Sequence, residues 1–311
     1  MTVLLLLLPP LLLPWALPPL ARRALDRLAP VAALWSVTGS AVLLAGCSTL
    51  ALGMSVLTGL LKLPLFAALG ELVHPLRTAS DAFVVPAAIA SAGALAGCGW
   101  SLVRAALDQT RAFRAARAEA ACGAVAGDLC VIDSSRPDAY ALPGRPHRVV
   151  VTTAMLRSLD GPEREALLAH ERAHTAGGHH YALAAAELAA HCHPALRPVR
   201  ATIRLAAERA ADEAAAVSVG DRRLTARAIA RAALAGQAAR FARPGIAPGA
   251  ATGPVPQRVQ ALLTAPSART ARAISALLPR PRPDHLSRRA GRRGRSPRGH
   301  ARQEHPSLRE Q

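Results

Sequence analysis

Three long runs without a charged residue dominate the first hundred positions of this chain. They cover residues 3–20, 31–61 and 82–103 and contain no Asp, Glu, Lys or Arg. At 1.5 Å per helical residue, the second run would be about 46 Å long and the third about 33 Å, and a bilayer core is about 30 Å thick. The sequence therefore predicts a multi-pass membrane protein, with three transmembrane helices in a membrane domain of residues 1–104.

The first two runs carry features that disturb a regular helix. Five prolines in residues 3–20 each lack a backbone N–H. The second run is longer than a bilayer requires, so we expect it to tilt or to break near Gly53. Basic residues follow the first run instead of preceding it, which is the reverse of a cleaved signal peptide.

Basic residues beside the spans predict the orientation. Arg22, Arg23 and Arg27 lie in the short loop after the first run, Lys62 and Arg77 precede the third run, and four Arg residues closely follow it. The positive-inside rule places residues 21–30 and the chain after residue 104 in the cytoplasm, with the N-terminus outside. The predicted location is the cell membrane, with a cytoplasmic C-terminal domain.

Charge and cysteine content exclude two other classes of protein. The formal net charge is +18, yet Lys62 is the only Lys and Ala is abundant, which is typical of GC-rich coding. We therefore expect no direct binding of nucleic acid. The five cysteines are far apart and form no CxxC pair, so neither a disulfide framework nor a cysteine zinc site is expected.

Residues 105–265 have the length and the pattern of a mainly helical α+β domain. Asp160 and Glu163 form a capping pattern at the start of a helix that should run toward His180. The other expected elements are a helical entry segment, two strands joined by a turn-rich loop, and two later helices (104–121; 129–133 and 149–153; about 197–218 and 222–240). Residues 266–311 are predicted to form a disordered basic tail. Within this segment, residues 280–311 contain ten Arg and three acidic residues.

The strongest chemical motif is the HExxH pentad formed by His170, Glu171 and His174. Residues four apart share one face of a helix, so both imidazoles can bind a single Zn²⁺ ion. The intervening Glu171 can then act as the general base toward water. The pentad predicts a catalytic zinc site.

A third ligand is expected from a different helix. Glu208 and Asp212 are four residues apart, and His-His-Glu is an established catalytic zinc set. Asp212 would accept a hydrogen bond from a ligating His. An alternative third ligand is His180, through the metzincin pattern with Gly177, but all three Met precede the pentad and none can form a Met-turn. We expect one Zn²⁺ per chain on His170, His174 and Glu208.

Four segments resemble one family of membrane peptidases. They are DAYALPG (138–144), VVVTTAMLRSL (149–159), EREALLAHERAH (163–174) and ERAADEAA (208–215). Over roughly residues 1–220 the chain resembles the membrane-integrated gluzincin peptidases, which include an HtpX and CAAX-prenyl-protease type and a BlaR/MecR antirepressor type. Three closely spaced N-terminal spans favour the BlaR/MecR type. Those sensors also carry a fourth span and an extracellular domain, whereas Ala273–Leu278 is too short to span, so direct antibiotic sensing is not expected.

The expected function is a membrane-bound zinc endopeptidase that cleaves cytosolic or membrane-proximal proteins. The resemblance implies a transcriptional repressor as substrate, or turnover of membrane proteins in an HtpX-like role. We expect the substrate to pair with an edge strand at 149–153, and an oxyanion donor among His179, His191, His193 and Tyr140. The alternatives are a non-catalytic zinc-binding scaffold, which would not need Glu171, and a transporter with a chance pentad, which the charge-free spans disfavour.

Overall fold

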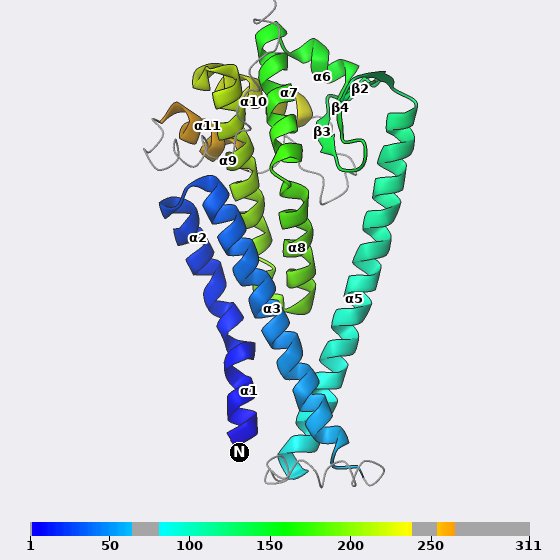
Figure 1. The fold of residues 1–311 in the computed structure, drawn as a ribbon, viewed down its shortest axis with the longest axis vertical. Helices are drawn as coiled ribbons and strands as arrows, with labels where there is room; N and C mark the ends of the chain where they lie inside the picture. The colour runs from blue at the N-terminus through cyan, green and yellow to red at the C-terminus, as the bar shows by residue number, and fades with distance from the viewer. Residues whose placement is uncertain (1, 64–80, 238–253, 265–311) are drawn as a thin grey trace, which may run out of the picture. The chain divides into compact units, whose positions relative to one another are not determined.

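The computed structural model describes residues 2–63, 81–237 and 254–264, which lie in a unit spanning Met1–Ala276 (Figure 1). This part of the chain is mainly helical with one small sheet, as the sequence predicts. The expected basic tail of residues 266–311 lies outside the described residues, and so do residues 64–80 with Arg77.

The first apolar run forms a broken helical segment instead of one helix. Its parts are helix α1 (Thr2–Leu12), a 3₁₀ helix η1 (Leu13–Ala16) and helix α2 (Leu17–Arg27). Pro14 has no N–H to donate to the carbonyl oxygen of Pro10. The Ser48 hydroxyl donates to that oxygen instead, at 2.7 Å. The prolines thus interrupt the helix, and a first membrane span at 3–20 stays a prediction.

Two described helices are long and apolar enough to cross a membrane, α3 (Pro30–Leu60) and α5 (Asp81–Ala121). Only 28% and 11% of their most apolar windows are buried, whereas a helix in the core of a soluble protein would be mostly covered. Of the two alternatives for the second run, a break near Gly53 does not occur, because α3 continues through it, and the tilt stays a prediction. The third run and the segment 104–121 form one continuous helix.

The sheet contains four strands in the order β1-β2-β4-β3 (β1 Ala124–Ala126, β2 Leu129–Ile132, β3 Ala139–Leu142, β4 Arg148–Thr152). The two expected strands, β2 and β4, pair in parallel, while β1 and β3 add antiparallel neighbours. The expected edge strand at 149–153 is therefore wrong, since β4 lies between β2 and β3. Strand β3 is an edge of the described sheet.

In the described part of the chain, six helices and a 3₁₀ turn follow the sheet (α6 Thr153–Ser158, α7 Gly161–Ala176, α8 His179–Cys192, η4 Pro194–Leu196, α9 Val199–Val219, α10 Arg222–Gln237, α11 Val255–Leu263). Helix α7 begins as predicted, but it ends four residues short of His180. Gly178 adopts a left-handed conformation with φ of 62°, which Gly accommodates without strain. The chain then starts α8, which the sequence analysis did not predict.

One hydrophobic cluster joins the N-terminal helices to the later ones. It contains side chains from α2, α3, α8 and α9, among them Leu25, Leu34, Leu183 and Ile203. Two polar contacts support the same junction, since His193 Nε2 lies 3.1 Å from the Leu11 carbonyl oxygen and Arg209 donates to the Leu25 carbonyl. Residues before and after position 104 thus pack on each other, and α9 is held against α2 and α3.

Candidate metal centre

Helix α7 starts at a complete capping box. The Glu163 backbone N–H donates to the Asp160 carboxylate at 2.9 Å, and the Asp160 N–H donates to the Glu163 carboxylate at 3.2 Å. These bonds satisfy two N–H groups that would otherwise lack a helical partner. The box fixes the start of the helix that carries the HExxH pentad in its last two turns.

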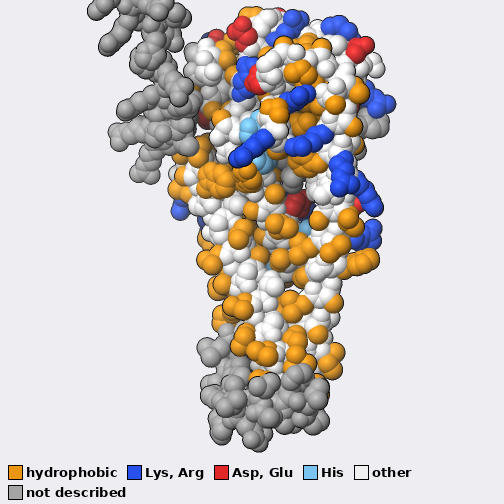
Figure 2. All heavy atoms as spheres, turned by 45° about the vertical axis from the view of Figure 1, so that its right-hand side comes forward, with side chains coloured by type: hydrophobic (Ala, Val, Ile, Leu, Met, Phe, Trp, Pro, Cys, Tyr) orange, Lys and Arg blue, Asp and Glu red, His pale blue; other side chains and the backbone are white. Residues whose placement is uncertain are grey.

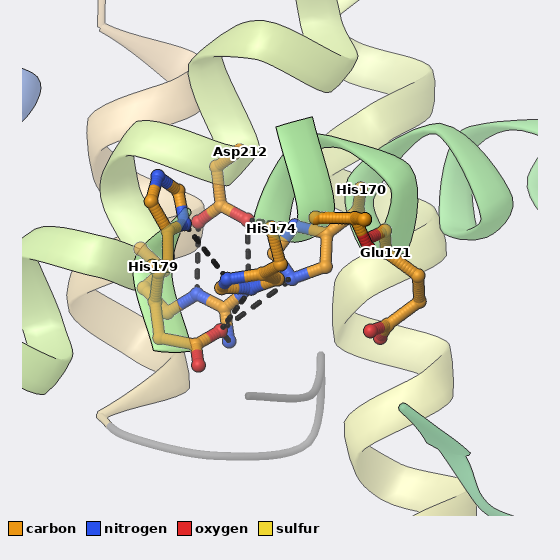
Figure 3. A network of polar contacts seen from close by, with 8 residues as sticks. His170, Glu171, His174, His179 and Asp212 are labelled. Carbon is orange, nitrogen blue, oxygen red and sulfur yellow. Dashed lines mark hydrogen bonds and ion pairs between the residues drawn. The ribbon is translucent and has the colours of Figure 1, made fainter. Parts of the chain in front are cut away.

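The structure brings His170 and His174 of α7, which Figure 3 labels, together with Glu208 of α9. Each residue offers one ligand atom, and these atoms all lie within 4.8 Å of one another. The distance between the two Nε2 atoms is 3.1 Å, and Glu208 Oε2 is 3.5 Å from His170 and 3.6 Å from His174. All three side chains are fully buried. Helices α7 and α9 are in direct contact, and small buried side chains flank Glu208 on α9, namely the alanines at 207, 210 and 211.

These distances fit a zinc ion. Zn²⁺ is bound at about 2.0–2.2 Å by nitrogen and oxygen ligands, so tetrahedral ligand atoms lie about 3.3–3.6 Å apart. Two imidazoles and one carboxylate are also the ligand types that a catalytic zinc site uses, with the fourth position open. The three side chains form a candidate metal site of the expected composition.

Each imidazole has a partner for its other ring nitrogen. His170 Nδ1 lies 2.9 Å from Asp212 Oδ1, and His174 Nδ1 lies 2.8 Å from His179 Nδ1. A His174 that offers Nε2 to a metal carries its proton on Nδ1, so His179 accepts this hydrogen bond. Both partners orient the Nε2 atoms toward the shared centre.

The position of His179 depends on two glycines. Gly178 provides the left-handed turn, and a Cβ at Gly177 would clash with the His179 imidazole. Burial, and the neighbouring His174, lower the pKa of His179 to about 3, so this imidazole is neutral near pH 7. His179 is one of the four candidate oxyanion donors expected from the sequence, but its contact is with His174.

The structure adds one residue that the sequence analysis missed, Arg258 of α11. Its Nε and Nη2 atoms donate to the two oxygens of Asp212 at 2.8 and 2.6 Å. Its Nη1 atom lies 3.1 Å from Glu208 Oε2, the candidate ligand atom. Arg258 is fully buried. One guanidinium therefore contacts both Glu208 and Asp212 of α9.

The charges of the centre favour a cation. Burial is the largest single effect and opposes ionisation of Glu208 and Asp212, but the charge of Arg258 and the contacts with the neighbouring imidazoles together outweigh it and lower the pKa of both carboxyl groups. Burial likewise opposes protonation of His170, but hydrogen bonds to Asp212 and Glu208 raise its pKa to about 9. The carboxylates thus stay ionised and stabilise positive charge next to His170.

Glu171 is fully buried and extends from α7 beside the two imidazoles (Figure 3). Its negative charge is among the causes that raise the pKa of Arg258, after those of Asp212 and Glu208 and against the opposing effect of burial. It is not one of the three clustered ligands. A carboxylate at this place beside the cluster is suited to acid and base chemistry.

The remaining candidates lie elsewhere. The His180 ring contacts Tyr181 and His147, and His180 is not in the metal cluster found among the described residues. His193 lies against the Leu11 carbonyl and the Trp15 ring. Tyr140 is buried in the cluster between the sheet and α5, and burial raises its pKa to about 12. His191 lies in the last turn of α8.

Comparison with known proteins gives one match. Residues 109–196 match the family model of peptidase family M48. This segment includes the sheet, α7 and the pentad, and it ends before Glu208, Asp212 and Arg258. No curated protein and no solved structure matches the chain. The match supports a zincin-type metallopeptidase, and it does not distinguish the BlaR/MecR type from its relatives.

Proposed function

We propose that this protein is a membrane-bound, zinc-dependent endopeptidase that cleaves cytosolic or membrane-proximal proteins. The observation that carries the proposal is the buried cluster of His170, His174 and Glu208 with Glu171 beside it. The M48 match over the segment that contains the pentad supports the same reaction. The resemblance to BlaR/MecR peptidases suggests a transcriptional repressor as substrate, and that to HtpX suggests membrane proteins.

In this proposal His170, His174 and Glu208 hold one Zn²⁺ ion. When bound, the ion would supply a Lewis acid that polarises the scissile carbonyl and promotes deprotonation of water. Glu171 accepts the proton of the attacking water on a carboxylate oxygen and delivers it to the leaving amine. Asp212 and His179 keep the two imidazoles oriented during these steps.

We also propose that the substrate binds as an added strand along β3. Among the described residues β3 pairs with β4 on one side only, and α7 packs against it. A peptide paired with the other side of β3 would have its backbone amides satisfied. This replaces β4, which is paired on both sides and cannot accept a further strand.

Metal removal tests the proposal. We expect the detergent-purified protein to contain one zinc per chain and to cleave an unfolded protein such as casein. Treatment with 1,10-phenanthroline should stop cleavage, and added Zn²⁺ should restore it, since imidazole and carboxylate ligands bind the metal reversibly. Zinc without cleavage would favour the scaffold alternative, and no zinc would overturn the proposal.

The membrane part of the proposal rests on the surfaces of α3 and α5. Their exposed side chains include large apolar residues such as Leu43, Leu50, Ile89 and Trp100. On the face that Figure 2 shows, Lys and Arg side chains gather toward the end that carries the sheet, and the coloured side chains of the narrower part below them are mostly apolar. This separation is the pattern of a protein whose basic end faces the cytoplasm.

We expect reporter fusions placed before and after α5 in the chain to give opposite results. Alkaline phosphatase fused after residue 120 should be inactive, because four Arg follow the apolar part of α5, and the same reporter fused after residue 62 should be active. An N-terminal tag outside the cell would indicate three spans, and a tag inside would indicate two. Active phosphatase after residue 120 would contradict the cytoplasmic placement.

A further inference from the structure

Arg258 occupies a position in which an arginine is seldom found. It is fully buried, and side chains of this type are almost never buried without paired charges. Its partners are Asp212 and Glu208, both from α9 and both fully or nearly fully buried. The contact joins α11 to the centre of the candidate metal site.

The planar guanidinium group of Arg258 matches the placement of the two carboxylates. Two nitrogens form a fork on the Asp212 carboxylate, and the third reaches Glu208 Oε2. A planar group with donors in fixed directions can hold two carboxylates at a set distance, which a lysine cannot do. Arg258 therefore constrains the candidate ligand Glu208 and the residue that orients His170.

The charges of the site also indicate a role for Arg258 in metal binding. Glu171, Glu208 and Asp212 carry three negative charges when ionised, and Arg258 carries one positive charge. A Zn²⁺ ion would add two positive charges and would balance the group. Without Arg258 the group would keep an uncompensated negative charge in a buried position, which is costly.

We propose that Arg258 is a positioning residue of the metal centre, which holds Glu208 and Asp212 in the arrangement that binds zinc. This inference rests on the proposed function, because it assumes that the cluster binds zinc. It makes α11 part of the metal site, although α11 lies outside the segment that matches the peptidase family.

Other contacts hold α11 in place without Arg258. Arg222 of α10 donates to the carbonyl oxygens of Ala261 and Leu262 near the end of α11, and it also pairs with Glu213. Leu262 and its apolar neighbours pack against α9 and α10. Replacement of Arg258 can therefore be tested in a chain whose α11 keeps these contacts.

The test compares Arg258→Met and Arg258→Lys in the full-length protein in detergent. Zinc dissociation constants are measured by competition with a chelating indicator, and thermal unfolding is followed with and without Zn²⁺. We expect Arg258→Met to weaken zinc binding about 10–100-fold, the range for loss of a residue that supports a metal ligand. Arg258→Lys should weaken it less, because the charge is kept and the fork is lost.

Arg231→Met is the matched control. Arg231 also pairs with a carboxylate, Glu163 at the start of α7, with 2.6 Å between Nη1 and Oε2, and it contacts none of the three candidate ligands. The zinc affinity of the Arg231→Met variant should stay within about threefold of the wild type, since the Arg231 side chain is half exposed. A purely structural role of Arg258 would lower the unfolding temperature without a change in zinc affinity beyond that of this control.

The outcomes separate this inference from the proposed function. Wild-type protein that binds zinc, together with Arg258 variants that bind it equally well, would overturn the role of Arg258 alone. If Arg258→Met does not fold, Arg258→Lys decides by the same criterion. Wild-type protein that binds no zinc would overturn the proposed function and this inference with it.

Discussion

Replacing Glu171 by Gln should lower kcat for peptide cleavage by about 10²–10⁴-fold, while one zinc stays bound per chain. The amide has nearly the same shape as the carboxylate, but it cannot accept the proton of the attacking water. Glu171 is outside the cluster of three candidate ligands, so its replacement leaves that cluster intact. The measurements are kcat on an unfolded protein substrate and zinc content of the same samples.

Glu187→Gln provides the control for this variant. Glu187 lies on α8 and pairs with Arg200 at 2.7 Å, away from the candidate ligands. The same chemical change there should leave kcat unchanged. If Glu171→Gln lost its zinc as well, Glu171 would have a role in metal binding. If it retained full activity, Glu171 would not be the general base.

Local signals allowed parts of the fold to be predicted from the sequence. The start of α7 depends on Asp160 and Glu163, which are three residues apart and form the capping box that was expected. The spacing of four in the pentad, and again between Glu208 and Asp212, follows from the geometry of one helix. Such short-range patterns predicted the residues that the structure brings together on α7 and α9.

The end of α7 and the strand β3 could not be predicted from such local patterns. Gly177 and Gly178 lie within the expected helix, and only the left-handed φ of Gly178 shows that the chain ends one helix and starts another. Strand β3 lies inside a segment of turn residues, and its four residues are buried by the sheet neighbours and by helices distant in sequence. Tertiary packing thus determines both where α7 ends and where β3 forms.

Arg258 could not be found from local pattern. It contacts Asp212 across 46 residues of sequence, and the chain is so rich in arginine that one more carries little information. Its burial is the property that distinguishes it, and burial becomes known only when α11 is placed against α9. The spacing of the motifs therefore could not indicate that Arg258 belongs to the site, and only the folded structure shows this contact.

Replacing Glu208 by Gln should weaken zinc binding by more than about 100-fold, and cleavage should be lost with it. The change removes the charge of the third candidate ligand, and loss of a supporting residue alone already costs about 10–100-fold in metal affinity. Glu208→Gln keeps the volume of the side chain, and Arg258 retains Asp212 as its partner. The zinc dissociation constant and the unfolding temperature should both be measured.

His180→Ala is the comparison that decides between the two ligand sets. The His180 imidazole contacts His147 and Tyr181, so its removal should leave zinc affinity and cleavage near wild-type values. The opposite pair of results, with zinc kept in Glu208→Gln and lost in His180→Ala, would favour the metzincin-like set. The structure predicts the first pattern, because Glu208 Oε2 lies within 3.6 Å of both imidazole Nε2 atoms.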